Sequence, residues 1–132
     1  MQNGSSSKHE VEYIVVLITA PTEEFAAEIG LDLVEHRLAA CATVIPQVRS
    51  IYRWDGGIHD EREAQLIVKT SAAKYDKIQA RVRKMHPYQV PEILALPIHD
   101  GSSTYLRWID GATYKGMLLQ EPGAPKGRRQ HS

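Results

Sequence analysis

Residues 43–70 read TVIPQVRSIYRWDGGIHDEREAQLIVKT, and this stretch decides the fold. Its first half alternates as a half-buried strand does, with one face formed by Val48, Ser50, Tyr52 and Trp54. The run 55–57, Asp-Gly-Gly, predicts a tight turn, because a two-residue hairpin loop needs positive φ at its centre. Apolar residues return at 64–70, so the stretch predicts a β-hairpin. Pro46 cannot donate a ladder hydrogen bond, which places it at a bulge or on an edge strand.

The first strand of this hairpin is expected to be unusually long. Residues 43–54 would span roughly 40 Å at ~3.3 Å per residue, about twice the usual strand. Neighbouring strands of roughly six or seven residues cannot cover it. The overhang carries Ile51, Tyr52 and Trp54, which are too apolar to be left in water. We therefore expect it to pair with another copy of the chain.

Strand and helix patterns flank the hairpin on both sides. The β-branched run 13–19 is typical of a central strand, and a second buried strand is expected over 93–98. Helices are expected from Thr22 onward, over about 72–85 and over about 104–112. The order βα, ββ, αβ predicts an α+β fold of the split βαβ type, with helices on one face of an antiparallel sheet.

The first helix has two features of its own. Its apolar positions Ala26, Ile29, Leu33 and Ala40 lie at helical spacing. Gly30 inside it costs up to ~1 kcal/mol relative to alanine, which suggests close contact between helix and sheet.

Length and charge restrict the class of protein. A chain of 132 residues with 42% apolar content fits one domain, which we place at 12–114 between a disordered leader (1–11) and a disordered basic tail (115–132). Sixteen basic and sixteen acidic residues balance, so nucleic acid and membrane are not expected partners. The single cysteine, Cys41, excludes an internal disulfide and favours the cytoplasm.

The linker after the second helix, residues 85–93, reads MHPYQVPEI. Pro87 and Pro91 stiffen it, and it carries an imidazole, a phenol and a carboxylate at His86, Tyr88 and Glu92. Such a linker either holds a small binding site or ends a helix. Both interpretations stay open from the sequence alone.

Cys41 and His86 are the candidate metal ligands, because thiolate and imidazole suit soft and borderline ions. Each follows a helix and precedes a strand, so we expect both at the same end of the sheet. The alternatives are a small buried Cys41 and a polar helix-end His86. A Cys41–His86 nucleophile would lack an oxyanion donor and an orienting group, and no zinc-finger spacing or phosphate loop occurs. An enzyme is not expected.

Other side chains favour a pocket. Tyr52, Trp54 and Tyr88 would either line one at a subunit boundary or pack in an interface. Lys69 ends a strand before a helix start, where it would contact an anion or cap the helix.

The chain resembles the CutA divalent-cation tolerance proteins. The resemblance covers roughly residues 13–113 and is carried by residues 38–41 (LAAC), 50–56 (SIYRWDG), 67–70 (IVKT), 86–93 (HPYQVPEI), 95–98 (ALPI) and 105–108 (YLRW).

This resemblance implies a ferredoxin-like homotrimer with a cytoplasmic role in tolerance of copper and other divalent ions. It implies Cys41 and His86 as ligands, with Trp54, Tyr88 and Glu92 on motif positions of less defined role. Gln89 replaces a usual glutamate, and Ala42-Thr43 replaces a usual Val-Asn. A single cysteine cannot form a multi-thiolate copper site within one subunit.

We therefore predict a non-enzymatic trimer that binds copper or another divalent ion near subunit boundaries. The rival hypothesis is a PII-like signalling trimer that senses an anion, nucleotide or small metabolite in inter-subunit clefts. Its pocket would comprise Tyr52, Trp54, Lys69, Tyr88 and Glu92. Arg49 and Arg53, with Lys69, are cations that a metal site would not need.

Overall fold

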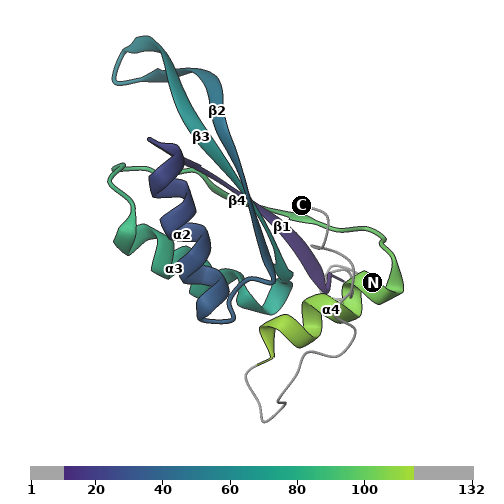
Figure 1. Cartoon of the computed structure of the whole chain (residues 1–132). Coiled ribbons are helices and arrows are strands. Elements are labelled where there is room, and N and C mark those ends of the chain that lie inside the picture. Colours follow the sequence, from purple (N-terminus) through teal and green to yellow (C-terminus); the bar gives the residue numbers. More distant parts are fainter. Residues whose placement is uncertain (1–10, 115–132) are drawn as a thin grey trace.

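The computed structural model describes residues 11–114. The expected tail lies outside this range, and so does the expected leader apart from Val11. Along the chain the elements are β1 (Tyr13–Ala20), α2 (Glu23–Glu35), β2 (Cys41–Trp54), β3 (Gly57–Ser71), a 3₁₀ turn (Ala72–Lys74), α3 (Tyr75–Met85), β4 (Ile93–Pro97) and α4 (Ser103–Thr113), as Figure 1 shows.

The four strands form one antiparallel sheet in the order β2-β3-β1-β4. β1 lies between β3 and β4, and its side chains Ile14, Val16 and Ile18 are buried. The predicted central strand is therefore confirmed. Element order and sheet order together are those of a ferredoxin-like βαββαβ fold, as predicted.

Helices α2 and α3 lie together on one face of the sheet (Figure 1). The core beneath them contains Ile14, Val16, Ile29, Leu33, Leu66, Val68, Ile78 and Val82. At the start of α2, the Thr22 hydroxyl accepts a hydrogen bond from the Phe25 amide at 3.0 Å, which is the expected cap. A Cβ at Gly30 would lie only 2.9 Å from the Ala42 Cβ. The close helix–sheet contact predicted at this glycine is confirmed.

The end of the first helix differs from the prediction, and the strand expected to be buried over 93–98 is instead a mostly exposed edge strand. Helix α2 ends at Glu35, so Ala40 is buried outside it. Arg37 has φ of +58°, a left-handed conformation that an α-helix cannot continue through. The amides of Leu38 and Ala39 both donate to the Leu33 carbonyl, at 2.9 and 3.2 Å, and close the turn. Ala40 matches the apolar spacing of the helix because the turn that follows α2 is also packed against the core.

The hairpin formed by β2 and β3 extends beyond the other two strands of the sheet (Figure 1). β2 has 14 residues and β3 has 15, against 8 in β1 and 5 in β4. β1 pairs with β3 only over 64–71, so the overhang predicted from the sequence is confirmed. Asp55 and Gly56 have φ of +53° and +79°, as the turn requires. The register shifts between Ile45 and Val48, which places Pro46 at a bulge on an edge strand.

Helix α4 packs on the opposite face. Side chains alternate along a strand, so Tyr13 points away from the face of Ile14, and its phenol donates to Asp110 of α4 at 2.7 Å. The same face leaves Leu94, Leu96 and Ile45 exposed at 56%, 48% and 38%. Within residues 11–114, no helix has the length and apolar character needed to span a membrane.

Candidate functional site

His86 ties the linker after α3 to the central strand. Its side chain is buried, and Nδ1 accepts a hydrogen bond from the Tyr88 amide at 3.2 Å. Because Nδ1 is an acceptor, we place the ring proton on Nε2, which lies 2.6 Å from the Thr19 carbonyl and donates to it. Phe25 packs edge-on against the ring. Both nitrogens of His86 are therefore occupied within the chain.

Tyr88, two residues further on, reaches the hairpin. Its hydroxyl donates to Oε2 of Glu63 at 2.7 Å. Burial, followed by this hydrogen bond, raises the pKa of the Tyr88 phenol well above its usual value. The phenol is therefore a neutral donor at physiological pH. Glu63 itself is only 8% exposed.

The linker and the hairpin together enclose an open cleft of about 540 Å³. The hairpin contributes Ser50, Tyr52, Trp54 and Glu63 to its walls, and the linker contributes Tyr88 and Glu92. The stiff backbone predicted around Pro87 and Pro91 thus carries one wall of a cavity. The linker ends α3 and also forms one wall of this cleft.

The hairpin register explains how its residues meet in the cleft. Ser50 pairs with Glu61 and Tyr52 pairs with His59, so these side chains share one face. The rings of Tyr52 and His59 stack with centroids 5.3 Å apart. The Tyr52 hydroxyl donates to Glu61 at 2.7 Å, and this bond raises the pKa of the phenol.

Lys69 does not line the cleft that a single chain forms. The structure brings Tyr52, Trp54, Tyr88 and Glu92 together at one cleft, but Lys69 pairs with Cys41 on one side and Val15 on the other. It lies near the end of β3 that leads into α3, whereas the cleft lies past the far end of that helix.

Arg49 and Arg53 are also directed away from the cleft walls. They alternate with Ser50, Tyr52 and Trp54 along β2, and so lie on the other face of the hairpin. Arg49 makes a two-pronged contact with Asp60, with N–O distances of 2.8 and 2.7 Å. The three cations expected to attract an anion are therefore not among the residues that line this cleft.

Cys41 and His86 do not meet within one chain, and the prediction that they share an end of the sheet is wrong. Cys41 is level with Val15 through Lys69, whereas His86 bonds to Thr19, roughly 13 Å further along β1. β1 and β3 are antiparallel, so the helices that follow them run in opposite directions and end at opposite ends of the sheet. Cys41 is buried with Thr43 Oγ1 3.7 Å from its sulfur. No cluster of three metal-ligating side chains occurs among residues 11–114.

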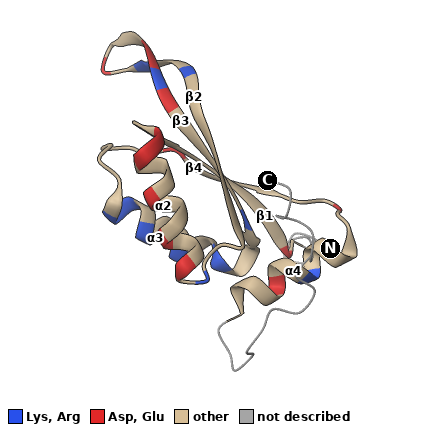
Figure 2. Cartoon of the chain, viewed as in Figure 1, with Lys and Arg blue, Asp and Glu red and all other residues tan. Residues whose placement is uncertain are grey.

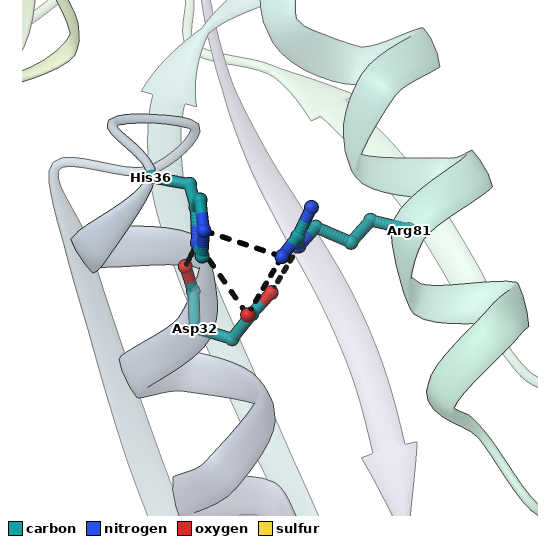
Figure 3. A network of polar contacts seen from close by, with 3 residues as sticks. All are labelled: Asp32, His36 and Arg81. Atoms are coloured by element: carbon teal, nitrogen blue, oxygen red, sulfur yellow. Dashed lines mark hydrogen bonds and ion pairs between the residues drawn. The ribbon is translucent and has the colours of Figure 1, made fainter.

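A second polar group joins the two helices on the far side of the core. Arg81 of α3 forms an ion pair with Asp32 of α2 through both Nε and Nη2, and His36 completes the network (Figure 3). The guanidinium lowers the pKa of the Asp32 carboxyl. Lys77, Arg81 and Lys84 line a neighbouring pocket of about 320 Å³, and basic residues gather along α3 (Figure 2).

Sequence reasoning missed Glu63, which lay unremarked in the charged run 59–63. Pairing residues outward from the Asp55-Gly56 turn could have placed it near Val48. The bulge at Pro46 and the position of Tyr88 could not be read from the sequence. Thr19, whose carbonyl accepts the hydrogen bond from His86, was also missed, because this contact joins residues far apart in the sequence.

The fold and the cleft define a ferredoxin-like α+β protein with an open cleft lined by acidic and aromatic side chains. Over residues 14–112 the chain matches the family model described as "CutA1 divalent ion tolerance protein", and it belongs to this family. Family membership agrees with the expectation of a non-enzymatic tolerance protein.

Individual relatives support the assignment. The chain is 50% identical over 95 residues to the divalent-cation tolerance protein CutA of Thermus thermophilus, covering 72% of this chain and 92% of the relative. It spans 61% of the length of the CutA homolog of Xenopus laevis, at 42% identity over 70% of this chain.

Solved structures agree with this fold. The Thermus thermophilus protein superposes with a TM-score of 0.72 at 49% identity, covering 74% of this chain and 94% of that one. A CutA of Archaeoglobus fulgidus, described as periplasmic, gives 0.75 at 36% identity, covering 77% and 99%.

Proposed function

We propose that the protein acts as a homotrimer that binds a divalent metal ion, copper foremost, in metal tolerance. The relatives from Thermus thermophilus and Archaeoglobus fulgidus are described as divalent-cation tolerance proteins. Two surfaces of this chain favour self-association. On one face of the sheet, Leu94 and Leu96 of β4 and Ile45 of β2 are exposed at its two edges, and Ile51 and Ile58 are exposed on the hairpin overhang.

The observation that carries the assembly proposal is the hairpin overhang. Residues 57–63 of β3 have no β1 partner, and β2 is an edge strand along its whole length. A strand edge of this length is a template for pairing with another chain. Light scattering at micromolar concentration is expected to give three times the monomer mass, and a monomer would contradict the proposal.

The metal part of the proposal concerns Cys41 and His86. Since they lie at opposite ends of the sheet, a site that uses both has to be completed by a second copy of the chain. His86 would also have to exchange its hydrogen bond from the Tyr88 amide for a metal bond. Copper suits such a thiolate and imidazole pair.

Calorimetric titration with Cu²⁺ tests this assignment. The variant Cys41→Ser/His86→Gln is expected to lose binding, and glutamine keeps a donor toward the Thr19 carbonyl. His99→Gln, an exposed histidine elsewhere, is the matched control and should bind as the parent does. Unchanged affinity in the double variant would reject both residues as ligands.

We also propose a cytoplasmic location, which rests on the single reduced cysteine. Fractionation of the native host, with the protein detected by antibody, decides between cytoplasm and periplasm. Recovery in a periplasmic fraction, as the name of the Archaeoglobus relative would suggest, would reject it.

A second candidate function is PII-like sensing of a small molecule. The observation that favours it is the cleft of about 540 Å³ between hairpin and linker, which is of ligand-binding size. A thermal-shift screen of metabolites beside divalent ions tests it, with Trp54→Ala as the cleft variant because this ring lines the cleft. A hit whose shift persists in this variant would place the ligand elsewhere.

A further inference from the structure

Glu63 is a buried carboxylate that no basic side chain compensates among residues 11–114 of its own chain. It is 8% exposed, and its one hydrogen bond comes from the neutral phenol of Tyr88. No ion pair of residues 11–114 includes it, and its second oxygen has no hydrogen bond within that range. Buried charges in proteins are ordinarily paired. A negative charge at the wall of an open cleft therefore lacks, within the described part of its own chain, the partner that its burial calls for.

The remaining walls add to this negative potential. Glu92 is a second carboxylate of the lining, and no lysine, arginine or histidine is part of it. Arg49 is engaged by Asp60 on the other face of the hairpin. A cleft of this charge attracts cations and repels anions.

The aromatic rings of the cleft favour an ammonium ion over a metal ion. Tyr52, Trp54 and Tyr88 all line the cleft, and aromatic faces attract ammonium groups through the negative ring quadrupole. A hard metal ion would require several oxygen ligands at fixed distances, and the described chain has no cluster of three ligating side chains. The walls fit a cation that carries alkyl groups against the rings.

We propose that this cleft binds an organic ammonium ion, with Glu63 as counter-ion and Tyr52, Trp54 and Tyr88 as an aromatic enclosure. This inference deepens the second candidate function, because it names the charge and chemical class of the ligand. It reverses the expectation of an anion, which depended on Lys69, Arg49 and Arg53.

Choline and its uncharged isostere 3,3-dimethylbutan-1-ol are the matched probes, since they share a shape and differ in charge. The chain has two tryptophans, so the Trp108→Phe background leaves Trp54 as the fluorescent reporter inside the cleft. Choline is expected to change this fluorescence saturably. The alcohol should bind at least about tenfold more weakly, as loss of a cation–π contact and an ion pair predicts.

Variants separate the role of Glu63 from nonspecific attraction. Glu63→Gln, in the same background, keeps an acceptor for Tyr88 and should weaken choline about tenfold. Glu28→Gln removes an equal charge from the exposed face of α2 and should leave choline affinity unchanged. Equal affinity for choline and the alcohol would overturn the proposal, and so would tighter binding of inorganic phosphate than of choline.

Other outcomes distinguish this inference from the functions on which it rests. A thermal shift with phosphate that responds to Trp54→Ala, without choline binding, would retain a sensing cleft and reject the cation. No binding of either probe would reject the ammonium site, while the metabolite screen still decides the sensing function. Cu²⁺ titration and light scattering of Glu63→Gln should match the parent, because neither metal ligation nor assembly depends on Glu63 in these proposals.

Discussion

Two carboxylates in this molecule have opposite surroundings, and the contrast separates a structural contact from a candidate site. Asp32 meets the guanidinium of Arg81 between two helices (Figure 3), where its charge is neutralised within the chain. Glu63 is more deeply buried yet meets only the phenol of Tyr88. The Asp32–Arg81 pair joins α2 to α3, and the charge of Asp32 requires no external partner. The second leaves an unbalanced charge facing a cleft, which indicates a ligand.

The largest expected effect comes from removing the donor to Glu63. Tyr88→Phe leaves a buried carboxylate without its hydrogen bond, and should lower the free energy of unfolding by about 1–3 kcal/mol. Guanidinium unfolding at fixed protein concentration measures the change. In a Glu63→Gln background the same substitution should cost less, since no charge is then stranded. Equal losses in both backgrounds would mean that the Tyr88–Glu63 contact is only packing.

Asp32→Asn should have a smaller effect, which depends on pH. The pKa of Asp32 is lowered in the folded protein by Arg81, so the pair stabilises the fold fully above the unfolded value of about 4. That stabilisation, about 1 kcal/mol or less for a partly exposed pair, is lost as pH falls through the folded pKa. Unfolding free energies of parent and variant should therefore differ at pH 7 and converge in acid. A constant difference would contradict the assignment to charge.

Glu63→Gln should act in the opposite direction. Glutamine can still accept from Tyr88 while removing the uncompensated charge, so the unfolding free energy should stay equal or rise by up to about 1 kcal/mol. The same unfolding measurement at pH 7 compares it with Asp32→Asn. A loss as large as that of Asp32→Asn would show that the charge of Glu63 is already balanced, and would weaken the contrast between the two carboxylates.

Tyr52→Phe should have the smallest effect. Its phenol makes a bond to Glu61 with the same 2.7 Å length as that of Tyr88 to Glu63, but both partners lie at an exposed position. Water replaces the lost donor, so the denaturation midpoint should not change measurably. A shift comparable to that of Tyr88→Phe would show that burial does not decide between these two bonds.

The fold could be predicted because its determinants are local. The turn at Asp55-Gly56 needs positive φ, the hairpin is long by residue count, and Gly30 marks the close approach to Ala42. The end of α2 could not be predicted, because buried Ala40 continues the apolar spacing beyond the left-handed Arg37. Local patterns fix the type of an element more firmly than its last residue.

The site could be predicted only in part. The aromatic residues of the hairpin and the linker were identified, because such residues are unusual in exposed strands and turns. Cys41 and His86 were misplaced relative to one another, because the end of the sheet at which a residue lies depends on strand direction across the whole sheet. The role of Glu63 depends on the position of Tyr88, 25 residues away, which no local pattern encodes.

The bulge at Pro46 has a consequence for solubility. The outer strands of the sheet are β2 and β4, and each carries a proline: Pro46 within β2 and Pro97 at the end of β4. A proline offers no amide to a foreign strand, so it interrupts the continuous ladder that amyloid growth requires. The bulge at Pro46 divides the edge of β2 into two shorter segments, one before it and one after it. The long hairpin can accept a bounded partner strand while resisting open-ended stacking.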